Sequence, residues 1–499
     1  MQAIKQDTNA LQNWVTRLDR RLYAVLVGLL IGGVGGLLGL LIAAFDPLIA
    51  AGAVLGVLIG LYILTSVSAA LYAMIAVMAL IPFGTFPVKI GFTPTLLDGA
   101  MGAFLLVYIF QWMTGRRQSF RLTPIHGLLV LYLGWLILSF VLGLRYASPT
   151  SADLRQFAET LLSIGMVFVL VDLLRDPATL RRLVLVVMLA AGTQAIIALV
   201  LYAMPDALAD RTLIRLARVG YPNAGVIRYI EDNPALAERA IGTWVDPNAF
   251  GGFLVITTAM IAPQIFARKP VLRWRWLAWL VLAICGLTTL LTYSRASMLS
   301  LALSIGFISL FKGYRKFIPL LVGGFLILLL LPQTQGYLFR FVEAFTGSDL
   351  STQMRLGEYG DALRLIRQYP VTGVGFTGTP SIDLYTDAAS MYLIMANQIG
   401  LVGVGLFASV MLGVFAYGLK AWRRVQGSTE LRSILLGYHA ALVAALLNGT
   451  ADLYFFRLDF QASITLFWLT VALALASSRL ALEQAGDSDR VARRAAITS

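Results

Sequence analysis

The chain has 499 residues, of which 59% are hydrophobic and 13% are charged, a composition that excludes a soluble globular protein of this size. Its formal net charge is +13 at pH 7, but Lys and Arg stand in short clusters between long apolar runs, so the charge indicates membrane topology and excludes nucleic acid as the partner. Only helices and closed barrels span lipid, and these runs do not alternate apolar with polar residues, which favours helices.

We predict an all-α integral membrane protein with about 14 transmembrane helices. Only Thr65 and Ser66 separate the second apolar run from the third, so about 13 helices with one re-entrant segment is the alternative. The runs lie near residues 21–44, 47–65, 66–82, 95–113, 124–144, 154–174, 179–203, 247–267, 275–291, 295–311, 317–331, 388–418, 432–448 and 460–478.

The basic clusters occur on alternate connections between these runs, for example at Arg116, Arg117 and Arg121. The positive-inside rule therefore places this side, with both chain termini, in the cytoplasm. Residues 1–20 are predicted to form a cytoplasmic amphipathic helix, with a frayed tail as the alternative, and residues 479–499 a disordered cytoplasmic tail. The single cysteine, Cys285, lies in a predicted span, so the outer loops hold no disulfide.

Two outer connections are much longer than the others, and we expect function to concentrate in them. The first loop, 204–246, separates transmembrane residues 21–203 from 247–331, and the second loop, 332–388, precedes transmembrane residues 389–478. Both loops are too rich in Leu, Ile and Tyr for disorder, so each is predicted to contain an amphipathic helix.

Every cation in these two loops is an arginine. Arg211, Arg215 and Arg218 follow the spacing i, i+4, i+7, which predicts a basic stripe on a helix at the membrane surface. The stripe would reach the depth of lipid headgroups or a lipid-linked diphosphate. Anchoring to anionic lipids is the alternative to a role in catalysis.

Arg239 precedes the segment IGTWVDPNAF, which enters a transmembrane run. Asp246 and Asn248 flank Pro247 there, and this pattern is typical of a helix start, so capping is the alternative to a substrate contact. At the outer end of a later run, Tyr293, Ser294 and Arg295 form a polar, cationic turn between two apolar helices. This turn is predicted to face a wet cavity, with snorkelling of the arginine as the alternative.

In the second loop, residues 351–370 predict an amphipathic helix that ends before Pro370. Arg355, Glu358 and Arg364 lie on it, and Gly373 and Gly375 follow in a tight turn. Because arginine offers a fork of donors suited to phosphate and glycine lets the backbone approach a ligand, this segment favours an anionic, phosphorylated ligand. A surface helix with solvated charges is the alternative.

Four segments occur in order: GTWVDPNAFGGFL, LLTYSRASMLSL, RLGEYGDALRLIRQYPVTGVG and ASMYLIMANQIGLVG. Together they resemble the O-antigen ligase and O-antigen polymerase superfamily of membrane glycosyltransferases over about residues 239–418. The resemblance implies an enzyme of the bacterial plasma (inner) membrane whose active face is periplasmic or extracellular. Its donor would be a polyprenyl-diphosphate-linked glycan and its acceptor a glycan or a lipid, with membrane lipids and a chain-length regulator as further partners.

By this resemblance Arg239 and Arg355 are catalytic, and Arg364 with Gly375 fits a pattern of Arg, ten residues, Gly. Ligases of the family carry a histidine near the fourth segment, whereas this chain has only His126 and His439, both in predicted spans or at their ends. Asp387 stands at the corresponding place and is our candidate base. This departure favours a polymerase over a ligase.

Other candidate bases among the outer carboxylates are Asp383, Glu358 and Asp246. The departing diphosphate needs stabilisation of charge, and each arginine contact could contribute about 2–4 kcal/mol in the transition state. No cluster of His, Cys or paired carboxylates at ligand spacing occurs in the outer loops, so we predict neither a metal nor another cofactor.

Two rival functions stay open. One is a ligase that attaches the glycan to a lipid or protein. The other is a flippase for lipid-linked oligosaccharide, which would need charges along an inner cavity at mid-membrane depth. The predicted spans are nearly free of charge and the arginines gather in two loops, which favours the enzyme.

Overall fold

The structure is a computed structural model that describes residues 62–86, 91–272, 274–330, 350–378, 387–425 and 429–498, with a few single residues elsewhere. The predicted N-terminal helix, the first apolar run and nearly all of the second therefore lie outside the described residues. The chain divides into two compact units, residues 1–69 and 70–499, and the packing and the sites described below belong to the second unit.

The secondary structure of the described residues is mostly helix, with one two-stranded hairpin, which confirms the predicted all-α class. Eight of its helices are long and apolar enough to cross a membrane: α5 (Leu96–Met113), α6 (His126–Gly143), α7 (Ser151–Leu173), α8 (Pro177–Ala203), α10 (Pro247–Ile265), α16 (Met391–Arg424), α17 (Thr429–Asn448) and α18 (Gln461–Thr498). Shorter apolar helices are α4 (Val67–Leu80), α11 (Arg275–Leu291), α12 (Arg295–Ser309) and α13 (Phe317–Leu330). The count of about 14 spans and the orientation of the termini stay predictions.

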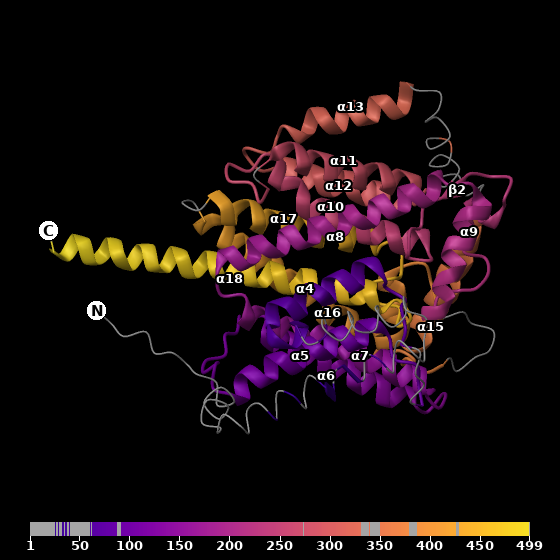
Figure 1. Ribbon diagram of the computed structural model, residues 1–499, viewed down its shortest axis with the longest axis horizontal. Helices are drawn as coiled ribbons and strands as arrows, with labels where there is room; N and C mark the ends of the chain where they lie inside the picture. Colours follow the sequence, from indigo (N-terminus) through magenta and orange to yellow (C-terminus); the bar gives the residue numbers. More distant parts are fainter. Residues whose placement is uncertain are drawn as a thin grey trace. The chain divides into compact units, whose positions relative to one another are not determined.

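Helices α10 and α18 form the core, since their apolar segments are buried along nearly their whole length. Helix α10 packs chiefly against α17, and α18 packs chiefly against α7. The remaining elements are α9 (Asp206–Ile214), η1 (Arg215–Val219), β1 (Arg228–Tyr229), η2 (Ile230–Asp232), β2 (Glu238–Arg239) and α15 (Leu350–Gln368). Figure 1 shows α9, β2 and α15 at one end of the long helices, opposite the end from which α18 projects.

Two local predictions need correction. The predicted arginine helix of the first loop is broken, because α9 ends at Ile214 and a 3-10 helix carries the chain to Gly220, whose φ is +90°. The tail predicted as disordered after Arg479 continues α18 to Thr498. Its sequence, LALEQAGDSDRVARRAAIT, is rich in Ala, Arg and Leu, which are strong helix formers, and this propensity outweighs its polarity.

The predicted helix before Pro370 is observed as α15, and the glycine turn after it packs against a break in α16. Gly400 has φ of +68° inside α16, which frees carbonyl groups on the preceding turn. The Val374 and Gly375 N–H groups donate to two of these carbonyls, at 2.8 and 2.9 Å, and the Trp135 indole donates to a third at 2.8 Å. The glycine turn was predicted to approach a ligand, and it instead packs closely against neighbouring helices.

We expect Gly375→Ala to destabilise the protein. Gly375 has φ of +81°, and a Cβ there would lie 2.5 Å from the Gly143 Cα atom, so strain and overpacking together should cost about 2–5 kcal/mol. A lower midpoint of thermal unfolding in detergent would show this. The control is Gly357→Ala, because Gly357 is helical and a Cβ there meets nothing within 4 Å. Equal midpoints for the two variants would contradict the packing role.

Candidate active site

A cavity of about 430 Å³ is lined by residues of β2 and α15 among others, and Figure 1 shows both elements at one end of the long helices. We call it the loop cavity. Four parts of the chain build it: the β1–β2 hairpin with the start of α10, helix α15, the segment before α16, and the α17–α18 connection. Its lining residues are Tyr229, Glu231, Asp232, Arg239, Asn248, Met354, Arg355, Glu358, Asp387, Ala389, Asp452, Leu453, Tyr454 and Arg457.

Arg239 is fixed in the loop cavity from two sides. It pairs with Arg228 in the antiparallel hairpin, and its Nε donates to the Thr292 carbonyl at 2.8 Å. Its Nη2 donates to Asn248 Oδ1 at 2.6 Å, so the first turn of α10 orients the guanidinium. The backbone N–H of Ala240 also donates to the Leu291 carbonyl, at 2.8 Å. The loop and the end of α11 therefore hold this arginine in one place before any ligand binds.

Arg355 reaches from α15 to the α17–α18 connection. Its Nη1 donates to the Ala451 carbonyl at 2.9 Å, and its Nη2 lies 3.6 Å from Asp452 Oδ1. The Asp452 side chain is only 3% exposed, and Asn448 donates to its other oxygen at 3.3 Å. Burial raises the pKa of Asp452 to about 7, although the nearby Arg355 and Arg239 guanidinium groups act in the opposite direction. This carboxylate can therefore exchange a proton near neutral pH.

A second group of charges lines the loop cavity. Asp387 is paired with Arg457, whose Nη2 lies 3.4 Å from Asp387 Oδ2, and Arg457 Nε donates to Asp459 at 2.8 Å. Glu358 accepts a hydrogen bond from the Ala389 N–H at 3.0 Å, and burial raises its pKa. The cavity thus combines three arginines with several carboxylates, which suits a ligand that carries both phosphate and sugar hydroxyl groups.

The structure brings together five residues that the sequence predicted for the site: Arg239, Arg355, Asp387, Asn248 and Glu358. Tyr293, Ser294 and Arg295 are not among the lining residues, but their turn contacts one residue of the cavity, Arg239. The Thr292 carbonyl holds Arg239, Tyr293 has φ of +52°, and Ser294 caps α12. Asp246 caps α10 by accepting from the N–H groups of Asn248 and Ala249, the alternative named for it above.

The other predicted residues lie away from the cavity lining. Arg215 and Arg218 are exposed on η1. The Arg364 side chain is 68% exposed and pairs with Asp361 on its own helix, at 3.3 Å. Gly373 and Gly375 are buried against α16, and Asp383 lies outside the described residues.

Several cavity residues were not predicted from the sequence, and the most important of them are Asp452, Tyr454 and Arg457. They belong to the connection between α17 and α18, which reads NGTADLYFFRLDF from Asn448 to Phe460. The signal was present, since two aspartates and an arginine stand there between apolar helices. Function was expected in the two longest outer connections, and this connection is short. In the described part of the chain, no group of three His, Cys, Asp or Glu side chains is placed to hold a metal ion.

A comparison with known families matched one segment of the chain. Residues 278–408 match the family model described as O-antigen ligase. This O-antigen ligase match confirms the resemblance predicted from the four segments. A comparison with curated proteins found no match.

The O-antigen ligase match includes the Arg295 turn, Arg355, Glu358 and Asp387. Arg239, Asp452 and Arg457 lie outside it, so their place in the cavity comes from the structure alone. Members of the family are O-antigen ligases and polymerases, enzymes of glycan assembly, and the match with the apolar helices indicates a multi-pass membrane protein with a glycosyltransferase role of this type.

Proposed function

We propose that the protein transfers a glycan from a polyprenyl diphosphate to a sugar hydroxyl of an acceptor glycan, and so extends a surface polysaccharide at the outer face of the bacterial plasma membrane. The observation that carries this proposal is the convergence of Arg239, Arg355 and Arg457 with the buried Asp452 in one cavity. Arginines from separate elements supply charge at one point, and a carboxylate beside them can accept a proton.

The reaction needs only the glycan donor and the acceptor hydroxyl group. The acceptor hydroxyl oxygen attacks the anomeric carbon of the donor sugar, and the bond from that carbon to the diphosphate oxygen breaks. The diphosphate leaves with the electron pair of that bond, and Arg239 and Arg355 stabilise its charge with donors that are already oriented. The hydroxyl proton passes to Asp452. The glycosidic bond thus forms while the polyprenyl diphosphate is released.

We favour a polymerase over a ligase, since Asp387 and Ala389 occupy the cavity wall where ligases are expected to carry their histidine. Either enzyme would use the same donor chemistry. The acceptor distinguishes them, because a polymerase extends the lipid-linked glycan and a ligase moves it to a different lipid or protein.

The test supplies purified protein in nanodiscs with a polyprenyl-diphosphate oligosaccharide and measures both products. Free polyprenyl diphosphate together with a longer glycan supports the proposal. Arg239→Ala should lower this release by about 100-fold, whereas Arg215→Ala, which changes an exposed arginine of the same loop, should leave it unchanged. Movement of intact donor across vesicles with no bond broken would instead establish a flippase.

A further inference from the structure

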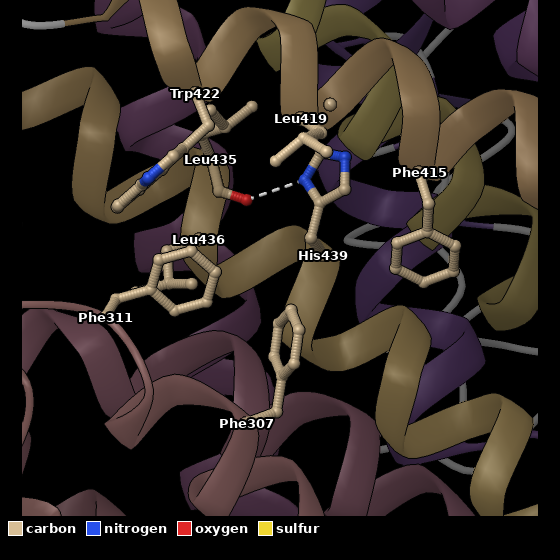
Figure 2. Close-up of a pocket in the computed structure, with 9 residues that line it drawn as sticks. Phe307, Phe311, Phe415, Leu419, Trp422, Leu435, Leu436 and His439 are labelled. Carbon is tan, nitrogen blue, oxygen red and sulfur yellow. Dashed lines mark hydrogen bonds between the residues drawn. The ribbon is translucent and has the colours of Figure 1, made fainter.

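A second cavity, which the proposed reaction does not use, lies among the membrane helices α12, α16 and α17 (Figure 2). It has a volume of about 220 Å³, and nearly all of its lining atoms are apolar. We call it the His439 pocket. It lies away from the loop cavity, because α16 begins and α17 ends beside the loop cavity, whereas Phe415, Trp422 and Leu435 lie several helical turns from those ends. Its lining residues are Phe307, Phe311, Phe415, Gly418, Leu419, Trp422, Leu435, Leu436 and His439.

His439 contributes an aromatic wall and little polarity. Its Nδ1 lies 2.8 Å from the Leu435 carbonyl, and because a carbonyl oxygen only accepts, Nδ1 carries the proton and donates (Figure 2). The other side of the ring packs so closely on Gly418 that a Cβ there would collide with it. The space that remains suits a hydrocarbon chain.

All three helices become basic at the same end of the pocket. On α17, Arg432 stands one turn before Leu435 and shares its face. On α16, Arg423 and Arg424 follow Trp422 directly, and Lys312 follows Phe311 in the turn after α12. The pocket is therefore apolar inside and cationic at one rim.

Arg432 connects this rim to the pocket wall. Its guanidinium carbon lies 4.4 Å from the centroid of a Trp422 ring. Its Nε is buried, and no described residue accepts a hydrogen bond from it. Leu419, which lines the pocket, is half-exposed on α16, so the pocket also reaches the surface that faces the hydrocarbon of the membrane. An occupant could enter sideways from the bilayer.

We infer that the His439 pocket binds an anionic phospholipid, with one acyl chain among the aromatic rings and the phosphate beside Arg432 and Arg423. The apolar interior favours an acyl chain, and the cations at the rim favour a negatively charged headgroup. A basic rim beside a gap between membrane helices is a recurring way to recognise anionic headgroups. A neutral phospholipid would fill the apolar part, but it would bring less negative charge to the Arg432 guanidinium, whose Nε has no acceptor among the described residues.

The test is native mass spectrometry of the protein released from nanodiscs that contain equal amounts of phosphatidylglycerol and phosphatidylcholine. We expect phosphatidylglycerol to be retained in preference. The double variant Arg423→Gln and Arg432→Gln should lower its apparent affinity by about 25-fold, since each arginine near a lipid surface contributes about fivefold. The matched control, Arg268→Gln with Lys269→Gln, removes two exposed charges from the α10–α11 connection. Equal retention of the two lipids, or an equal loss in the control, would overturn the inference.

A second variant tests the apolar part of the pocket separately. Leu419→Trp enlarges a half-exposed side chain at the pocket wall, and we expect it to lower phosphatidylglycerol retention at least as much as the double variant while the unfolding midpoint stays unchanged. Full retention by Leu419→Trp would show that headgroups bind to the arginines without a chain in the pocket. That result would also overturn the inference.

Discussion

Replacing Arg355 with alanine should lower the rate of glycan transfer by about 10²–10³-fold, the effect of removing one oriented donor from a transition-state site. Arg355 contacts the Ala451 carbonyl and Asp452 from the wall of the loop cavity. Its loss therefore removes a positive charge that would stabilise the leaving diphosphate. It also leaves the Asp452 carboxylate without its cation. We therefore expect the pH at which activity is half-maximal to rise in this variant, because the neighbouring guanidinium holds that pKa down.

The matched control is Arg364→Ala, which changes the same residue type on the same helix. Arg364 lies nine residues after Arg355, and nine residues turn an α-helix by about 180° beyond whole turns, so the two side chains point to opposite faces. The Arg364 side chain is exposed and pairs with Asp361. Equal losses in the two variants, measured as release of polyprenyl diphosphate, would show that α15 acts by folding and not by presenting Arg355.

This contrast explains what the sequence could and could not predict about the site. Arg239, Arg355 and Asp387 were predicted from the resemblance of their segments to a known family, and Glu358 from its place on the amphipathic helix of the second long loop. The sequence does not state which face of α15 meets the cavity, so Arg364 was grouped with Arg355. That face is set by tertiary contact with the α17–α18 connection.

The role of Asp452 could not be predicted for the same reason. Its connection is short, and its importance depends on the end of α17 lying beside α15, which no local pattern contains. The fold was more predictable, because lipid requires continuous apolar helices and every predicted run from 66–82 to 460–478 contains one. The glycine turn shows the limit of that reasoning, since Gly375 was expected to approach a ligand and instead approaches α6 and α16.

Replacing Asp452 with asparagine should lower the rate of transfer by about 10²–10⁴-fold above neutral pH, the usual contribution of a general base. The substitution keeps the size of the side chain and its place between Arg355 and Asn448, so the fold should persist. Protein that unfolds at the same temperature as wild type would confirm that the loss is chemical.

The pH dependence distinguishes Asp452 from the base that the sequence favoured. Only the ionised carboxylate can accept the hydroxyl proton, and burial raises the pKa of Asp452 to about 7, so the wild-type rate should increase as the pH rises through that value. Asp452→Asn should remove this increase, and Asp387→Asn should keep it, because Asp387 is more exposed and is engaged by Arg457. If Asp387→Asn abolishes the increase and Asp452→Asn retains it, the base is Asp387 and the role of Asp452 is to hold Arg355 in place.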